Sequence, residues 1–142
     1  MRNTIHTTTP AETEELGGQL AHELGAGDVV LVEGELGAGK TTFVRGACRA
    51  LGVSGPVTSP TFTIGQRYPA RIPVAHIDLF RVESLEAEDP DLLDDYLRPD
   101  TIAFVEWPSR GEDEVSGLAR IVARVVIEHV GGDRRSIGIE RR

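Results

Sequence analysis

VVLVEGELGAGKTTFVRG, residues 29–46, joins an apolar run, a glycine-rich segment and a Lys-Thr pair without interruption. The apolar run is typical of a strand buried in a parallel sheet, and KTTFVRGACRAL predicts a helix that ends at Gly52. Between them the sequence fits G-x-x-x-x-G-K-[ST], the pattern of a phosphate-binding loop. A chance glycine-rich turn would lack this strand–loop–helix context, so we interpret the segment as such a loop. The matching residues are Gly34, Gly39, Lys40 and Thr41.

The residues of this loop have separate chemical uses. Glycines such as Gly37 and Gly39 let the backbone pass close to phosphate oxygens and direct successive N–H groups towards them. The helix that begins near Lys40 adds the positive end of its dipole. We expect Lys40 to reach the β- and γ-phosphates of a nucleotide and the Thr41 hydroxyl to ligate Mg²⁺.

Two acidic residues end apolar runs downstream of the loop: VAHID ends at Asp78 and IAFVE ends at Glu106. A phosphate-binding loop needs carboxylates that hold Mg²⁺ or position water, and these usually lie at the end of an apolar strand. Each acidic residue taken alone is also compatible with an ordinary charged strand end. With the loop upstream, we expect at least one of the two to be functional.

Trp107, the only tryptophan, directly follows Glu106. Its ring is compatible with stacking on a purine and equally with core packing, and both hypotheses stay open. The sequence contains no N-K-x-D motif, the usual guanine reader, and no D-x-x-G follows the loop. These two features argue against a GTPase switch protein.

The composition predicts a single soluble domain in the cytoplasm. A length of 142 residues fits one domain, residues 1–142, and no run approaches the roughly 20 apolar residues of a membrane span. The start, MRNTIHTTTP, lacks the apolar centre of a signal peptide, and the single cysteine, Cys48, is expected to be a buried helix residue. The net charge is −8, whereas a protein that binds nucleic acid alone usually has a basic face. Any role in RNA metabolism is therefore expected to depend on a protein partner.

The remaining pattern predicts an α/β fold with a mixed sheet. Thr9, Pro10 and Glu12 form a T-x-x-E capping box that starts a helix, and Gly25 is expected to end it. The acidic segment ESLEAEDPDLLDDYL predicts two short helices broken at Pro90. The strand candidates are part of VTSPTFTIGQRY, RIPVAHIDLF, TIAFVEW, ARIVARVVIEHV and RRSIGIE, the last two as a terminal hairpin.

Four motifs, GELGAGKTTFVRG, VTSPTFT, HIDLFR and VEWP, occur in the order and spacing of a known family. Through them the chain resembles the small bacterial ATPases of tRNA threonylcarbamoyladenosine biosynthesis, the TsaE family, formerly YjeE. The loop is common to many nucleotide-binding proteins, and its combination with the other three motifs is much more specific. The resemblance spans nearly the whole chain. It implies a three-layer, P-loop NTPase-like α/β fold with a mixed, largely parallel central sheet and antiparallel strands at the C-terminal end.

The resemblance also implies an activity. ATP and Mg²⁺ would be the ligands, and hydrolysis would be slow in the isolated protein and dependent on its partners. The implied partner is the two-subunit complex that transfers threonylcarbamoyl to the adenosine next to the anticodon, and ATP hydrolysis would reset that complex between turnovers. Contact with tRNA would be indirect, through the partners, which agrees with the acidic charge.

Carried over to this sequence, the family motifs imply roles for named residues. Thr41 and Glu106 would hold Mg²⁺, and Lys40, Asp78 and Glu106 would be the catalytic residues. Trp107 would lie beside the nucleotide. The phosphates would be wrapped by Gly37, Ala38, Gly39, Lys40, Thr41 and Thr42.

Other positions are implied less specifically. Ser59, Pro60 and Thr61 would form a switch that senses the γ-phosphate. The family also brings two further regions towards the nucleotide, around Thr9 and Pro10 and around Gly132 and Arg134. Arg81 is open between a phosphate contact, a partner contact and a surface salt bridge. Phe80 stands where many members have tyrosine, so any role of that hydroxyl is absent, and Ser109 is given no role.

Two other classes of function stay open on the sequence. One is a small-molecule P-loop kinase, although the chain has little length for a lid and an acceptor pocket. The other is a nucleotide-sensing module that binds ATP without hydrolysing it.

Overall fold

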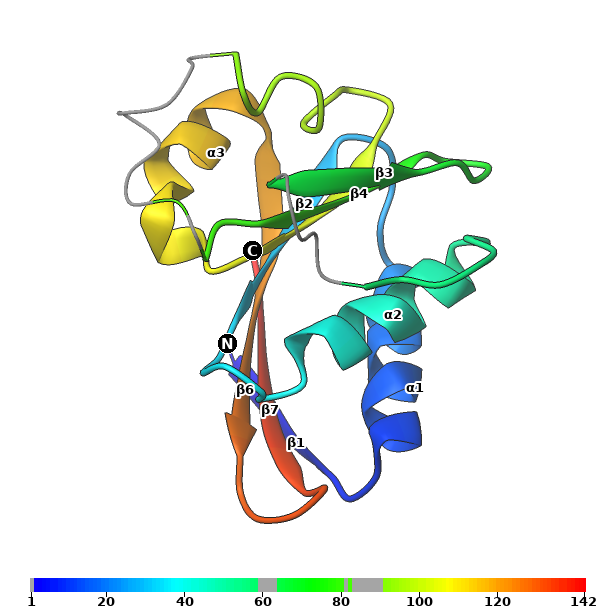
Figure 1. The fold of residues 1–142 in the computed structure, drawn as a ribbon, viewed down its shortest axis with the longest axis vertical. Coiled ribbons are helices and arrows are strands. Elements are labelled where there is room, and N and C mark those ends of the chain that lie inside the picture. Colours follow the sequence, from blue (N-terminus) through cyan, green and yellow to red (C-terminus); the bar gives the residue numbers. More distant parts are fainter. Residues whose placement is uncertain (1, 59–63, 81, 83–90) are drawn as a thin grey trace.

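A seven-stranded sheet organises the computed structural model, which describes residues 2–58, 64–80, 82 and 91–142. The strand order is β1-β7-β6-β2-β5-β4-β3 (Figure 1). The strands are β1 (Arg2–Thr7), β2 (Asp28–Glu33), β3 (Gly65–Tyr68), β4 (Val74–Asp78), β5 (Ile102–Glu106), β6 (Arg120–His129) and β7 (Arg135–Arg141). The helices are α1 (Pro10–Ala21), α2 (Lys40–Ala50) and α3 (Glu112–Leu118), and a 3₁₀ turn, η2, covers Pro108–Arg110.

The centre of the sheet is parallel and its margins are antiparallel. Strands β6, β2, β5 and β4 run parallel, and β7 pairs antiparallel with β6. The mixed sheet and the terminal hairpin predicted from the sequence are therefore confirmed. Antiparallel strands also border the sheet at β1 and β3. The sequence did not predict β1, because RNTIHT has one apolar residue and no alternation, and its order comes from backbone pairing with β7.

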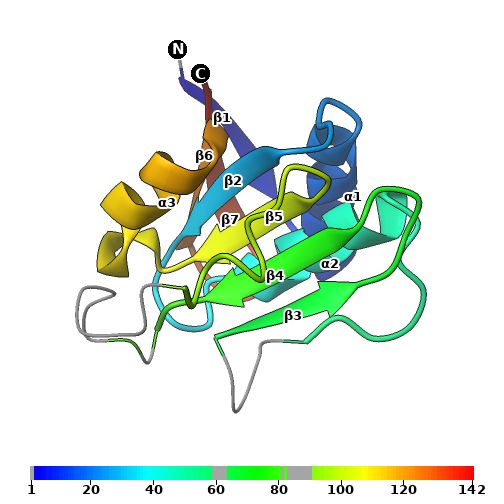
Figure 2. The ribbon, with the colours of Figure 1, turned by 90° about the horizontal axis from the view of Figure 1, so that it is seen from above.

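Helices cover both faces of the sheet. Figure 2 shows α1 and α2 on one side and α3 on the other. Val30, Val32 and Phe104 pack in the core beneath α1 and α2, whereas Leu31 and Val105 belong to the core on the side of α3. Burial on both faces explains why β2 is an unbroken apolar run rather than an alternating one.

Glycines allow α1 and α2 to cross at close range. A Cβ on Gly46 would lie 1.9 Å from the carbonyl oxygen of Glu14, and one on Gly17 would lie 2.1 Å from that of Phe43. No side chain larger than hydrogen fits at either place without a shift of the backbone. The crossing fixes α2, and therefore the loop at its N-terminus, against the rest of the protein.

The start of α1 agrees with the predicted cap, and its end does not. The Thr9 side chain accepts a hydrogen bond of 3.1 Å from the backbone N–H of Glu12, and Pro10 is the first helical residue. The helix ends at Ala21 rather than at Gly25. After Ala21 the backbone N–H groups of Glu23 and Leu24 bond to the carbonyl oxygens three residues earlier, of Leu20 and Ala21. This 3₁₀-type pattern terminates the regular helix.

The acidic segment and the region after β5 also differ from expectation. Residues 91–96 form successive turns instead of the second predicted helix, since three aspartates disfavour a helix and Pro99 follows closely. The first predicted helix of this segment falls largely on residues 83–90, outside the described ones. Helix α3 was not predicted, because only Val115 of its seven residues is buried and no periodic pattern can form. In the described residues, no helix is long and apolar enough to cross a membrane.

Candidate nucleotide-binding site

The glycine-rich loop between β2 and α2 has a backbone that its sequence explains. Gly34, Gly37 and Gly39 have φ values of 156°, 80° and 108°, in the region that disfavours other residues. At Gly34 there is also no room, because a Cβ would lie 2.5 Å from the carbonyl oxygen of Ile127 in β6. The loop is thus held between its own helix and the neighbouring strand.

Lys40, the first residue of α2, is folded back over the loop. Its ammonium group donates to the carbonyl oxygens of Gly34 (2.7 Å) and Glu35 (2.9 Å) and lies 4.2 Å from the centre of the Trp107 ring. Only 5% of the residue is exposed. Burial lowers the pKa of the Lys40 ammonium, and the nearby carboxylates of Glu106 and Asp78 oppose this shift. A cation is therefore held at the mouth of the loop.

The two predicted carboxylates lie side by side next to this cation. Asp78 and Glu106 are register partners at the carboxyl ends of the parallel strands β4 and β5. The Thr41 hydroxyl donates to Oε2 of Glu106 at 3.3 Å. Glu106 is 2% exposed, whereas Asp78 is half-buried and accepts the backbone N–H of Phe80 at 2.9 Å. Burial raises the pKa of Asp78; the Phe80 hydrogen bond acts against this shift, and the charge of Glu106 adds to it.

Trp107 has an unusual backbone and faces the loop. Its φ of 58° is the only positive value at a non-glycine residue among the described positions. The ring packs on Phe80 with 4.9 Å between centroids, and the Lys40 ammonium lies over the ring. Trp107 is partly buried, so it combines core packing with exposure to the site.

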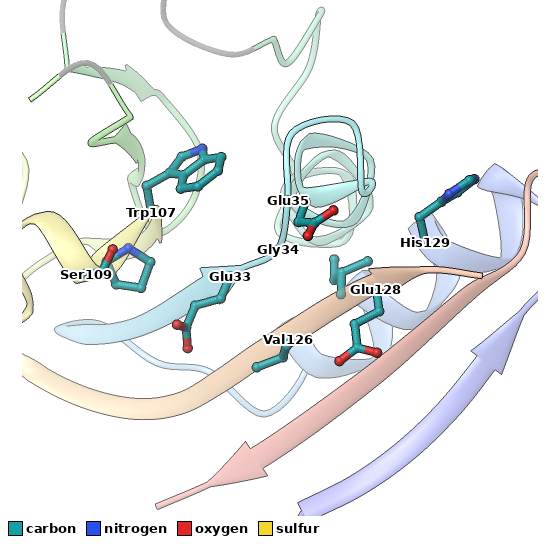
Figure 3. A pocket seen from close by; sticks show the side chains of 10 residues that line it. Glu33, Gly34, Glu35, Trp107, Ser109, Val126, Glu128 and His129 are labelled. Atoms are coloured by element: carbon teal, nitrogen blue, oxygen red, sulfur yellow. The ribbon is translucent and has the colours of Figure 1, made fainter. Parts of the chain in front are cut away.

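A cavity of about 520 Å³ lies beside the loop (Figure 3). Three carboxylates, a histidine and the Trp107 side chain border it. Its lining residues are Glu33, Gly34, Glu35, Trp107, Pro108, Ser109, Val126, Ile127, Glu128 and His129. Ser109, to which the sequence assigned no role, thus borders the space next to the loop.

Two residues that the sequence did not single out contact the site. His76 in β4 is fully buried, and its Nε2 makes a short contact with Oε2 of Glu106. Arg135, the first residue of β7, donates from Nε to the carbonyl oxygen of Ala38 at 2.7 Å. The available signal for His76 was its position two residues before Asp78, which places both on one face of β4.

The remaining expected residues lie in different places. Arg135 reaches the loop, whereas the guanidinium of its neighbour Arg134 lies beside Gly131. Gly132 contributes its carbonyl oxygen to Arg135 at 2.7 Å. Thr9 and Pro10 form the start of α1. The residues expected to form a switch, Ser59, Pro60 and Thr61, and also Arg81, lie outside the described residues.

The single cysteine takes no part in the site. Cys48 is fully buried in α2, as expected from the sequence. Burial raises the pKa of its thiol to about 12.

The donor groups beside the loop fit Mg²⁺ through few protein ligands. No group of three His, Cys, Asp or Glu residues in the described part of the chain could enclose a metal ion. Mg²⁺ usually keeps several waters and binds through one or two protein oxygens together with substrate phosphates. The Thr41 hydroxyl and the Glu106 carboxylate supply hard oxygen donors next to the loop, so their chemistry fits this ion.

The protein has the P-loop class of α/β fold. In it a strand leads through the glycine-rich loop into a helix, and a buried lysine faces carboxylates from two adjacent parallel strands. Within that class, the chain belongs to the family described as "Threonylcarbamoyl adenosine biosynthesis protein TsaE", whose sequence model matches residues 7–137.

Relatives support this membership over most of the chain. A Streptomyces coelicolor protein named tRNA threonylcarbamoyladenosine biosynthesis protein TsaE is 43% identical over 122 residues, covering 84% of this chain and 80% of the relative. The protein of the same name from Bacillus subtilis strain 168 is 39% identical over 132 residues, covering 92% and 80%. The crystal structure of Bacillus subtilis YdiB superposes with a TM-score of 0.79 at 31% identity, covering 99% of this chain and 86% of that one.

Proposed function

We propose that this protein is a Mg²⁺-dependent ATP-binding and ATP-hydrolysing accessory subunit for threonylcarbamoyl modification of the adenosine next to the anticodon of tRNA. Family membership supports the pathway, because the relatives are named for tRNA threonylcarbamoyladenosine biosynthesis. The place of action would be the cytoplasm, where tRNA is modified.

One observation carries the nucleotide-binding part of this proposal. Lys40, Thr41 and Glu106 meet at the mouth of the glycine-rich loop although Glu106 is 65 residues away from Thr41 in the chain. A buried cation at the N-terminus of α2 suits the β- and γ-phosphates. On binding, the Lys40 ammonium would exchange its loop carbonyls for phosphate oxygens.

The residues around the phosphates would have different roles. Thr41 and Glu106 would hold Mg²⁺, which when bound neutralises phosphate charge. Asp78, with its raised pKa, would accept or orient a water proton beside the γ-phosphate. Trp107 would pack near the nucleotide while it keeps Lys40 and Phe80 in place.

The proposed partner is the two-subunit threonylcarbamoyl transferase complex, and hydrolysis would reset this complex between turnovers. A net charge of −8 supports tRNA contact through the partners rather than through this chain. Because the catalytic groups are few, we propose slow hydrolysis in the isolated protein and faster hydrolysis with the partners.

The test is reconstitution of tRNA modification with the transferase pair, ATP and a threonylcarbamoyl donor. Multiple turnovers should require this protein, and ADP formation should rise when the transferase pair is added. A protein that binds ATP but forms no ADP with its partners would be a sensing module. Rapid ADP formation that depends on an added metabolite, with the cavity beside the loop as acceptor site, would instead identify a kinase.

A further inference from the structure

We propose that His76 is a positioning residue for the metal-binding carboxylate: its imidazole fixes Glu106 in the orientation in which that side chain holds Mg²⁺ next to Thr41. This inference rests on the proposed function and adds to it a residue outside the loop. It concerns a buried contact between neighbouring strands.

The geometry links three side chains through one oxygen. His76 Nε2 contacts Oε2 of Glu106, and the same Oε2 accepts the Thr41 hydroxyl at 3.3 Å. A carboxylate that ligates Mg²⁺ only accepts hydrogen bonds, so in the proposed metal-binding state the imidazole donates from Nε2. The second carboxylate oxygen, Oε1, takes part in neither bond. Two donors on Oε2 therefore restrict the rotation of the carboxylate and leave Oε1 for the metal or a metal-bound water.

The sheet explains why His76 can reach Glu106. In the parallel register His76 lies opposite Phe104, two residues before Glu106, and Asp78 lies opposite Glu106. His76, Phe104 and Glu106 thus share the face of the sheet that carries α2. The imidazole extends along this face towards the carboxyl ends of the strands, beneath the site rather than within it.

Packing alone does not account for a histidine here. His76 is 0% exposed, and its Nδ1 is a buried polar atom without a hydrogen-bond partner in the described part of the chain. The same face of this sheet region holds Val74, Ile102 and Phe104, all fully buried. Burial of an unpaired polar nitrogen costs free energy, and an apolar side chain would avoid that cost. The contact to Glu106 supplies the reason for an imidazole.

Outer partners of this kind control metal binding in proteins. Hydrogen-bonded neighbours of ligating side chains orient them, and their loss typically weakens metal affinity or activity about 10- to 100-fold. Removing one partner of a buried polar contact also destabilises a fold, so the stability of each His76 variant has to be measured beside its metal dependence. Positioning of Glu106 predicts a loss of Mg²⁺ dependence in variants that are still folded.

Three substitutions separate positioning from packing. His76→Gln places an amide N–H near the position of Nε2 and can still reach Glu106. His76→Asn is equally polar but shorter, and His76→Leu is apolar. Val74→Ala is the matched control, because it removes buried volume from the same strand and face without contact to Glu106. Thermal unfolding of all four variants shows which of them are folded.

The readout is ADP affinity by calorimetry, measured in EDTA and then across a Mg²⁺ titration. We expect His76→Asn and His76→Leu to keep wild-type affinity in EDTA and to need at least about tenfold more Mg²⁺ for the same gain in affinity. The Mg²⁺ concentration that His76→Gln needs should stay within about threefold of the wild-type value. Val74→Ala should need the same Mg²⁺ concentration as wild type.

Wild-type Mg²⁺ dependence in a folded Asn or Leu variant would overturn the role of His76. The same conclusion would follow if His76→Gln lacked the wild-type Mg²⁺ dependence, or if Val74→Ala lost this dependence as fully as His76→Asn and His76→Leu do. A wild-type protein that binds no nucleotide under any condition would instead overturn the proposed function itself.

Discussion

Lys40 is the only lysine in the 142 residues, and its surroundings have opposing effects on its charge. Burial favours its neutral form, whereas Glu106, Asp78 and the Trp107 ring favour the cation. Two loop carbonyls hold its ammonium in place. These interactions keep an oriented positive charge at the loop, where an anionic ligand can replace the carbonyls.

Glu106 and Asp78 should differ on mutation, because Glu106 accepts the Thr41 hydroxyl whereas Asp78 accepts the backbone N–H of Phe80. Glu106→Ala should keep most nucleotide affinity in EDTA, lose the gain from Mg²⁺ and abolish partner-stimulated hydrolysis. Asp78→Ala should keep the gain from Mg²⁺ and still lower turnover. Both variants are checked by nucleotide titrations with and without Mg²⁺ and then by assays of ADP formation with the transferase pair. If Glu106→Ala hydrolysed ATP at the wild-type rate while Asp78→Ala were inactive, the metal-binding role would belong to Asp78.

Trp107 provides a direct optical signal, since it is the only tryptophan and its ring contacts the Lys40 ammonium. Movement of that ammonium onto phosphate should change the intrinsic emission when ATP or ADP binds, and GTP should change it much less. A titration of emission against nucleotide measures this effect, with Lys40→Ala as the control. Unchanged emission at saturating ATP, with binding verified by calorimetry, would leave Trp107 as a packing residue.

The elements that could be predicted from the sequence are those whose signals are local. The strand, loop and helix around Lys40 follow from adjacent residues, and the capping box marks the start of α1. The ends of β4 and β5 were predicted to carry the two carboxylates, because each follows an apolar run. Parallel pairing then brings Asp78 and Glu106 together.

Elements and contacts without local signals were missed. Strand β1 is almost wholly exposed and depends on pairing with β7, and α3 is too short to show a period. The contact of His76 with Glu106 spans 30 residues, and that of Arg135 with Ala38 spans 97. Such pairs depend on strand order, which the sequence leaves open.

The crossing of α1 and α2 allows a paired test of stability. Gly46→Ala should destabilise the protein by about 1–3 kcal/mol or more, because its Cβ would lie 1.9 Å from a backbone oxygen. Gly18→Ala in α1 is the matched control, since its nearest neighbours would be at 3.5 Å, an ordinary contact. Alanine's better helix propensity should make that variant more stable by about 0.5–1 kcal/mol. Urea unfolding of both measures the difference, and equal effects would show that the close approach of the helices does not control stability.

At the scale of the whole protein, the candidate site residues gather at one edge of the sheet. The carboxyl ends of β2, β4 and β5 meet there, and the first residue of β7 contacts the loop from the neighbouring hairpin. Acidic residues outnumber basic ones by 23 to 15 over the chain. This acidic charge, together with the proposed nucleotide site at that edge, is in line with the proposal that a protein complex, rather than RNA, contacts the protein.

Calorimetric titration of ATP with Mg²⁺ into the wild-type protein, Lys40→Ala and Arg49→Ala tests nucleotide binding at this loop most directly. Lys40→Ala removes charge-assisted hydrogen bonds worth roughly 1.5–3 kcal/mol each, which corresponds to at least about tenfold weaker binding. Arg49→Ala removes a positive charge from the same helix, but at the opposite end from the loop, where Arg49 pairs with Glu14 at 2.8 Å. We expect wild type and Arg49→Ala to bind alike and Lys40→Ala to bind at least tenfold more weakly. Equal affinity in a folded Lys40→Ala protein would contradict nucleotide binding at this loop.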